Sequence, residues 1–265
     1  MEQHNLLIAF GLTLLAGLST GIGGLLTYFS KQTNRSFLSF SLGLAAGVLL
    51  FVSFVEIFPE SLRLFESVVA PSKAFTYTLL SFFAGILVMA FIDVLCPHHI
   101  KMDRSVNTEN EQLKRSLKKM SILIALAVTL HNIPEGIAMF TIGVSNYRLV
   151  FPILLAIIIH NIPIGISISV PMYHATGNRI KALCLALITG LSTPLGALLA
   201  WLFILPYWSP ELEGIVLGAV SATMVYIAVD ELIPAAHHYG KSHYSKIGLI
   251  SGMALVAIAL LLMGE

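Results

Sequence analysis

The feature that most constrains this chain is a series of eight apolar segments, each long enough to cross a lipid bilayer. A transmembrane helix needs roughly 20 consecutive, mainly apolar residues. Of the 265 residues, 57% are hydrophobic and only 11% are charged, against about 25% charged in a soluble domain. We therefore expect an all-α polytopic membrane protein whose surface mostly contacts lipid. The expected spans lie at about 5–28, 37–58, 74–96, 120–144, 150–173, 180–204, 212–235 and 245–263.

The chain is expected to form one transmembrane domain over residues 1–265. Its connectors are short except for 97–119, which is rich in charged residues and is predicted to be a cytoplasmic loop. The N-terminal sequence MEQHNLLIAF lacks a basic segment and a small-residue cleavage site, so we interpret it as the start of the first span. The two cysteines are too few for a disulfide framework. A net charge of +1 gives no indication of a nucleic-acid partner.

The distribution of positive charge predicts the orientation of the spans. Lysine and arginine accumulate in the cytoplasmic loops of membrane proteins. If both termini lie outside, the inner connectors carry twelve of the fifteen lysines and arginines, and the outer ones carry Arg63, Lys73 and Arg148. We therefore predict eight spans with both termini outside. Glutamates such as Glu60 and Glu213 then lie on the outer side, as a rim that either concentrates cations or is only solvated.

Two of the spans resemble each other in sequence. GLAAGVLLFVSFVEIFP in the second span is similar to GAVSATMVYIAVDELIP in the seventh. In each copy a glycine, Gly43 or Gly218, comes thirteen residues before a glutamate, Glu56 or Glu231, and a proline follows three residues later. The two spans cross the predicted membrane in opposite directions. The pattern fits an inverted repeat of spans 1–3 and 6–8 around a central pair, 4–5, a common construction in transporters.

The fourth and fifth spans each contain a polar motif inside an apolar run. HNIPEG begins at His131, and HNIPIG begins at His160. His131 and Glu135 are four residues apart, so their side chains lie on one face of a helix, one turn apart. Pro134 has no N–H, which leaves the carbonyl of Leu130 without its helical donor and makes room for an ion or water. An imidazole nitrogen and a carboxylate oxygen at this spacing can bind one cation.

Other polar side chains also fall within the spans, where ionisable groups are costly and indicate function. Glu56, together with the two HNIP motifs, indicates a divalent-metal site rather than hydrogen bonds that only join helices. Asp93, Asp230 and Glu231 lie near the predicted cytoplasmic side, where they either form part of a transport path or give ordinary interfacial polarity.

The asparagines of the two motifs, Asn132 and Asn161, point away from the His/Glu face of their helices. They are expected either to take part in the transport path or to join neighbouring helices. The histidines near the predicted cytoplasmic ends of the third and seventh spans are metal-compatible, and they also suit an ordinary solvated loop. The small-residue pair Gly43 and Gly47 fits helix packing within one chain or between two, so a homodimer remains open.

At these motifs the sequence resembles the ZIP family of divalent-metal transporters, most closely its bacterial ZupT-type branch, over nearly the whole chain. HNIPEG, HNIPIG, AAGVLLFVSFVEIFPESL and VDELIP carry the resemblance. It implies uptake of zinc, and often iron or manganese, across a bacterial inner membrane. It also implies a mid-membrane metal site, with His131 and Glu135 as core ligands, Glu56 as a further ligand and His160 as their neighbour. The family resemblance further implies an elevator-like movement of a four-helix core.

Two residues depart from the family pattern. Relatives usually have glutamate where this chain has Ile164, and often have glutamate where it has Thr193. In family members with two adjacent metal ions, these glutamates help to hold the second ion. We therefore predict a single metal ion, bound by Glu56, His131, Glu135 and His160. Two carboxylates and two neutral imidazoles balance the charge of one divalent cation.

The sequence thus favours transport of a divalent transition metal, with Zn²⁺ first and Fe²⁺, Mn²⁺, Co²⁺ or Cd²⁺ compatible with the same ligands. The metal would be cargo, and no cofactor is expected. A second hypothesis is a membrane sensor that binds metal without moving it. A third is an intramembrane metalloenzyme with a catalytic zinc. Against that third hypothesis, the chain has no HExxH motif and no separate general base.

Overall fold

The computed structural model describes residues 3–29, 35–95, 109–145, 147–238 and 241–263, and nearly all of them are helical. Short π or 3₁₀ segments join several of the helices end to end. The α-helices are α1 (Gln3–Leu25), α2 (Arg35–Val52), α3 (Phe58–Glu66), α4 (Pro71–Leu95), α5 (Glu109–Ser145), α6 (Tyr147–Thr176), α7 (Arg179–Gly190), α8 (Ser192–Leu199), α9 (Pro210–Tyr226), α10 (Ile233–His238) and α11 (Ser242–Met263).

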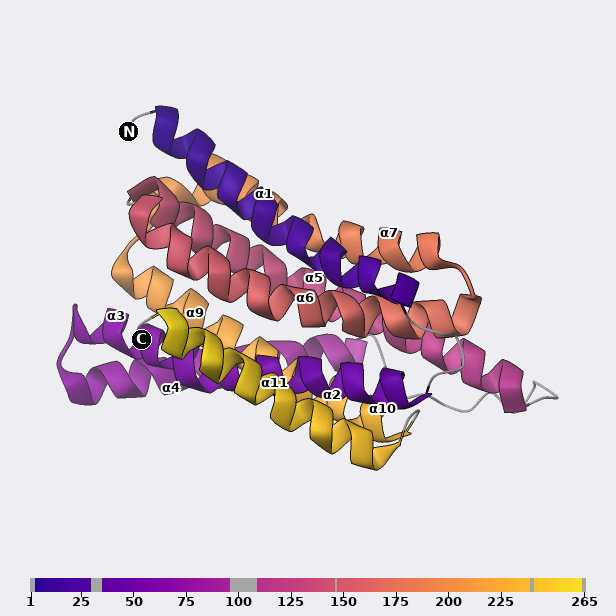
Figure 1. Ribbon diagram of the computed structural model, residues 1–265. Coiled ribbons are helices and arrows are strands. Elements are labelled where there is room, and N and C mark those ends of the chain that lie inside the picture. Colours follow the sequence, from indigo (N-terminus) through magenta and orange to yellow (C-terminus); the bar gives the residue numbers. More distant parts are fainter. Residues whose placement is uncertain (1–2, 30–34, 96–108, 146, 239–240, 264–265) are drawn as a thin grey trace.

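The helices pack as two bundles that lie side by side (Figure 1). The first, which we call the core bundle, contains α1, α5, α6, α7 and α8. The second, the flanking bundle, contains α2, α3, α4, α9, α10 and α11. They meet where α2 packs on α6 and where α9 packs on α5. Segments distant in sequence are therefore neighbours, and α5 and α6 lie close to the boundary between the bundles.

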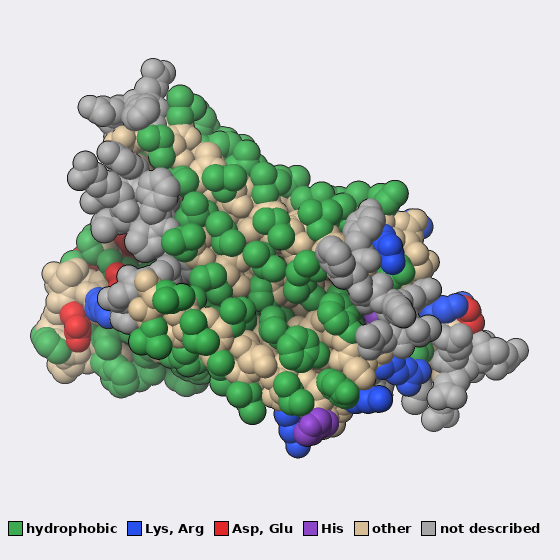
Figure 2. Space-filling model, in the orientation of Figure 1, with side chains coloured by type: hydrophobic (Ala, Val, Ile, Leu, Met, Phe, Trp, Pro, Cys, Tyr) green, Lys and Arg blue, Asp and Glu red, His purple; other side chains and the backbone are tan. Residues whose placement is uncertain are grey.

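Within the described residues, seven helical stretches are long and apolar enough to cross a membrane. Hydrophobic side chains cover much of the visible face, and charged ones gather towards its two ends (Figure 2). This arrangement is that of a multi-pass membrane protein. The predicted fifth span, 150–173, falls within α6, which is 30 residues long. The seven stretches are Asn5–Leu25, Arg35–Glu66, Pro71–Ile92, Glu111–Val144, Arg179–Tyr207, Pro210–His237 and Ser242–Leu262.

Helix α5 begins at Glu109, about eleven residues before the predicted start of the fourth span at 120, so part of the predicted loop 97–119 is helical. The charged N-terminal part of α5 and the apolar run form one continuous helix. Hydropathy detects only the apolar part, so it placed the start of the helix too late. Residues 97–108 of the predicted loop lie outside the described residues.

In the part of the chain that the structure describes, three spans contain a π-helical stretch, and each stretch is followed by a proline. Proline cannot donate the i to i−4 hydrogen bond, and its ring crowds the preceding turn. A wider turn with i to i−5 bonds relieves that crowding, and such turns are frequent at functional sites. The stretches and prolines are Ser53–Ile57 before Pro59, Ala200–Ile204 before Pro206, and Ile227–Leu232 before Pro234.

Close packing between α2 and α11 depends on small residues. A Cβ atom added at Gly43 would collide with the carbonyl oxygen of Ser245, and one at Gly47 would collide with that of Leu249. Helix α11 has its own glycine, Gly248, which faces the carbonyl of Phe40 in the same way. The small-residue pair that the sequence singled out thus packs within the chain, against α11.

Candidate metal centre

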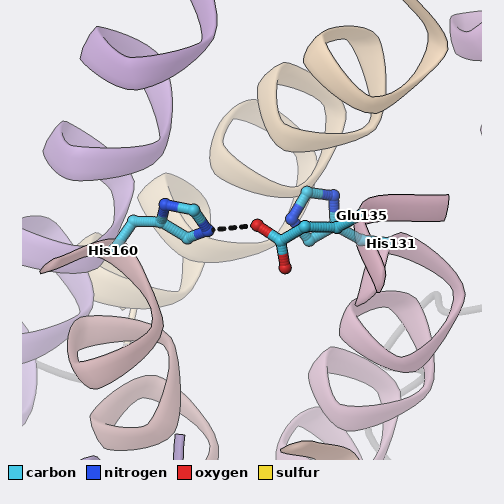
Figure 3. A group of neighbouring side chains, drawn as sticks. All are labelled: His131, Glu135 and His160. Atoms are coloured by element: carbon cyan, nitrogen blue, oxygen red, sulfur yellow. Dashed lines mark hydrogen bonds and ion pairs between the residues drawn. The ribbon is translucent and has the colours of Figure 1, made fainter. Parts of the chain in front are cut away.

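Helices α5 and α6 bring together the three residues that the HNIP motifs predicted (Figure 3). His131 and Glu135 project from successive turns of α5, and His160 projects from α6. Each residue offers one ligand-type atom, and these three atoms all lie within 4.8 Å of one another. Nε2 of His160 is 2.8 Å from Oε1 of Glu135. The rings of His131 and His160 have their centroids 6.3 Å apart.

The centre is buried but leaves polar atoms without hydrogen-bond partners. His131 and His160 are each 1% exposed, and Glu135 is 5% exposed. Both ring nitrogens of His131 and the second carboxylate oxygen of Glu135, Oε2, have no hydrogen-bond partner. Burying polar atoms without partners costs free energy, and buried charges are usually paired or bound to a metal. A cation between these side chains would supply the missing partner.

The donor set suits a divalent transition metal. Imidazole nitrogen and carboxylate oxygen are ordinary ligands of Zn²⁺, Fe²⁺ and Mn²⁺. Three such donors from two helices form an incomplete shell, which leaves positions for water or for a ligand from another helix. Cys184, the one cysteine among the described residues, is exposed on α7 and does not belong to this centre. The ligand atoms at this centre are therefore imidazole nitrogens and a carboxylate oxygen.

Proline and glycine shape the helices around the centre. Both α5 and α6 continue as helices through their prolines, Pro134 and Pro163. Neither proline can donate to the carbonyl four residues earlier, so those two carbonyls lack their usual helical donor. A Cβ at Gly136 would collide with the carbonyl of Thr193, which shows that α8 packs directly on α5 beside Glu135.

The two asparagines bind backbone groups rather than joining the His/Glu cluster. Nδ2 of Asn132 donates to the carbonyl of Thr189 at 3.2 Å, and Nδ2 of Asn161 donates to that of Ala16 at 3.0 Å. Both bonds join helices of the core bundle, as one of the two predicted roles requires. The side-chain oxygen of each asparagine is buried and has no hydrogen-bond partner.

Glu56 occupies the π-helical stretch after α2, across the boundary between the bundles. Its carboxylate is not among the three atoms of the cluster. Glu56 does line a cavity of about 1090 Å³ that Glu135 and His160 also line. The structure thus places Glu56 on the same space as two of the predicted ligands, but not within ligand distance of all three.

The remaining predicted positions are separate from this centre. Asp230 and Glu231 lie in the π-helical stretch Ile227–Leu232 of the flanking bundle. Glu231 lines a small pocket with Tyr226 and Leu130, which the large cavity does not include. Asp93 belongs to α4, and its side chain lies outside the described residues. The histidine pair that follows it is also outside them.

The two positions that depart from the family pattern are both buried. Ile164 is 1% exposed and belongs to the largest apolar cluster of the protein, together with Ile168. Thr193 is fully buried, and its hydroxyl oxygen has no hydrogen-bond partner. Neither position therefore offers a carboxylate: Ile164 contributes apolar packing, and Thr193 contributes a neutral hydroxyl.

The sequence did not indicate Trp208 at the large cavity, and it placed the charged residues that line the cavity mouth only on the outer side, without grouping them. Arg63, Trp208 and Glu213 line this cavity, together with Glu60. A periodic signal existed for part of this set, because Glu56, Glu60 and Arg63 recur at helical spacing on one face. No local pattern could indicate that Trp208 and Glu213, from another part of the chain, face the same space.

Comparison with known proteins agrees with this architecture. A family model described as ZIP zinc transporter matches residues 95–260. The chain belongs to the ZIP zinc transporter family. Members of that family are transporters, so the intramembrane metalloenzyme considered from the sequence is not supported.

Individual ZIP family relatives match over almost their entire length, and each is named zinc transporter ZupT. The relative from Streptococcus mutans is 45% identical, over 99% of this chain and 99% of its own. That from Lysinibacillus sphaericus is 44% identical, over 98% of both chains. That from Corynebacterium glutamicum is 46% identical, over 97% of this chain and 99% of its own. The resemblance to the ZupT-type branch, seen first in the motifs, is confirmed.

Proposed function

We propose that this chain takes up divalent transition-metal ions across the membrane into the cytoplasm, with Zn²⁺ as its first substrate. The observation that carries the proposal is the convergence of His131, Glu135 and His160 in the interior, beside a cavity that reaches the surface. Three relatives with the printed name zinc transporter ZupT support zinc as the cargo. Fe²⁺, Mn²⁺, Co²⁺ and Cd²⁺ fit the same donors.

The proposed site holds one ion. Glu135 supplies one carboxylate, and Glu56 supplies a second from the flanking bundle once the bundles close around the ion. Two carboxylates with two neutral imidazoles balance a single divalent charge. Ile164 and Thr193 provide no carboxylate for a second ion, and the burial of both side chains supports this count.

The proposed transport step alternates access to the centre between the two sides. The large cavity lies between the core bundle, which contributes Glu135 and His160, and the flanking bundle, which contributes Glu56. Relative movement of the bundles would close this cavity and open the opposite side. The described residues on that opposite side include Glu231, which lines only a pocket of about 10 Å³. Asp93, Asp230, Glu231 and the two asparagines are proposed to serve the path rather than the binding site.

The proposed topology has eight spans in a single domain, with the inverted repeat and both termini outside. Two observations support it: α6 adds one long helix to the seven apolar stretches, and α2 pairs with α11 as α4 pairs with α9. Those two pairs would be equivalent if spans 1–3 and 6–8 were related by a repeat. A cytoplasmic 97–119 loop follows from the same topology, and the resemblance to bacterial relatives supports a bacterial inner membrane. A homodimer is compatible with it.

The test is uptake of ⁶⁵Zn²⁺ by the purified protein in liposomes. Glu135→Ala and Glu56→Ala are compared with wild type, and Glu66→Ala serves as control because Glu66 is exposed on α3 and does not line the cavity. We expect uptake by wild type and Glu66→Ala and none above background by the other two. Binding without uptake by wild type would instead favour the sensor. Equal uptake by all four proteins would exclude the proposed centre.

A further inference from the structure

The large cavity connects the buried centre with a charged mouth. Glu135 and His160 lie at its buried end. At its other end, the side chains of Glu60 and Arg63 are 45% and 74% exposed. Glu213, in the first turn of α9, lines the same space. An ion that moves from solvent to the centre through this cavity therefore meets Glu60, Arg63 and Glu213 first. We call these three side chains the mouth site.

The charge along the cavity favours cations. Its charged lining consists of four glutamates and one arginine. A cleft lined mainly by one sign of charge, with low-dielectric walls, concentrates ions of the opposite sign and speeds their association. The acidic rim that the sequence placed outside the spans is thus not spread evenly: Glu60 and Glu213 face the cavity, whereas Glu66 does not.

Both mouth glutamates are held in place by other side chains. Nη1 of Arg63 lies 3.0 Å from Oε2 of Glu60, one helical turn away on α3. The indole N–H of Trp208 donates to Oε2 of Glu213 at 3.1 Å. Ser209 caps α9 by accepting from the N–H of Leu212 and so fixes the start of that helix. The bond from Trp208 engages one oxygen of Glu213, so the other can contact a ligand.

The buried end of the cavity carries a separate indication of a cation. Glu135 is 5% exposed and lines the cavity, and its Oε2 has no hydrogen-bond partner. A carboxylate oxygen buried in that state calls for a positively charged partner. Among the described residues, this cavity joins the surface to that oxygen. An ion that enters from solvent therefore passes the mouth site before it reaches Glu135.

We propose that Glu60 and Glu213 form an outer binding site for a hydrated divalent cation, and that Arg63 is its built-in counter-ion. The guanidinium neutralises Glu60 when no ion is present and swings towards solvent when a divalent ion arrives. A divalent cation has twice the charge of the guanidinium and can displace it, whereas a monovalent ion gains little against a tethered positive charge. The side chain of Arg63 is largely exposed, and Glu60 and Glu213 are only partly buried, so the site binds the ion weakly and passes it inward. This inference rests on the proposed function.

The experiment measures initial ⁶⁵Zn²⁺ uptake into proteoliposomes as a function of zinc concentration, at low and high ionic strength. Glu60→Gln and Glu213→Gln each remove one mouth carboxylate, and Arg63→Gln removes the counter-ion. Glu66→Gln is the matched control on the same helix, away from the cavity. For both glutamate variants we expect KM to rise about threefold to tenfold at low salt, with the maximal rate retained, and the difference to shrink at high salt.

The arginine variant is expected to change KM in the opposite direction from the glutamate variants. Arg63→Gln is expected to lower KM for Zn²⁺ and to let Na⁺ compete more effectively, since the mouth carboxylates are then unoccupied. KM values equal to that of Glu66→Gln in all three variants would overturn the mouth site while leaving the proposed function intact. A wild-type protein that moves no zinc would overturn the proposed function itself. Trp208→Phe removes the hydrogen bond that orients Glu213 but keeps its charge. This variant therefore separates the effect of the glutamate's charge from the effect of its position.

Discussion

Oε1 of Glu135 on α5 lies 2.8 Å from Nε2 of His160 on α6. Without a metal, the carboxylate and the imidazole satisfy each other, while Oε2 of Glu135 and both nitrogens of His131 have no hydrogen-bond partner. A metal at the centre would contact all three side chains, and the glutamate would then bind the ion in addition to its contact with the histidine. The bond therefore holds two ligands close together before the ion arrives, which lowers the entropic cost of binding.

The first prediction concerns Glu135. Glu135→Gln keeps the shape of the side chain and removes its charge. We therefore expect zinc affinity to fall by about tenfold to 100-fold, the range seen when groups that support a metal site are lost. The measurement is the rise in unfolding temperature of the detergent-solubilised protein when Zn²⁺ is added. A ligand at one hundred times its Kd stabilises the folded state by about 2.7 kcal/mol. Retention of the full zinc-induced shift in Glu135→Gln would contradict this prediction.

The second prediction separates Glu56 from the three clustered ligands. Glu56 lines the cavity from the flanking bundle and does not join the cluster. We expect Glu56→Gln to lower zinc binding less than Glu135→Gln does and to reduce uptake more strongly than binding, because Glu56 engages the ion only when the bundles close. Zinc binding by calorimetry and uptake in liposomes, measured on the same preparations, test this difference. Equal losses of binding in the two variants would mean that Glu56 is a ligand in every state.

The sequence predicted the parts of the structure that depend on local chemistry. Apolar runs identified the spans, and the i, i+4 spacing of His131 and Glu135 placed both on one helical face. The repeated HNIP motif then indicated His160 as their neighbour, and the structure brings all three together. Hydropathy and helical period are encoded within a single segment, which is why the sequence alone could predict helical spans and a shared helical face.

Other features could not be read in this way. The π-helical turns depend on how a proline is accommodated by its neighbours, and the start of α5 at Glu109 depends on a charged turn that hydropathy does not recognise as part of a span. The cavity arises from how two bundles meet. Trp208 and Glu213 face Glu60 only because helices far apart in sequence pack together.

The third prediction tests the number of metal ions. If the centre holds a single ion because Ile164 and Thr193 offer no carboxylate, the double variant Ile164→Glu with Thr193→Glu should bind a second one. Both positions are buried, so the added glutamates would destabilise the protein without metal and be stabilised when zinc binds. We expect the zinc content by mass spectrometry of the intact protein to rise from one to two. A content of two in the wild type would contradict the single-ion site.

The final prediction concerns the packing of α2 on α11, which holds the flanking bundle together. An alanine within a helix is normally more stable than a glycine by roughly 0.5–1 kcal/mol. At Gly47 the added methyl group would collide with the carbonyl oxygen of Leu249, so Gly47→Ala should destabilise the protein instead, by about 1–3 kcal/mol. Gly11 on α1 has no atom within 4 Å of the added position, so Gly11→Ala serves as control and should raise the unfolding temperature or leave it unchanged. Thermal unfolding in one detergent compares the two variants, and a lower temperature for Gly47→Ala alone would identify steric packing, rather than glycine flexibility, as the reason for the residue.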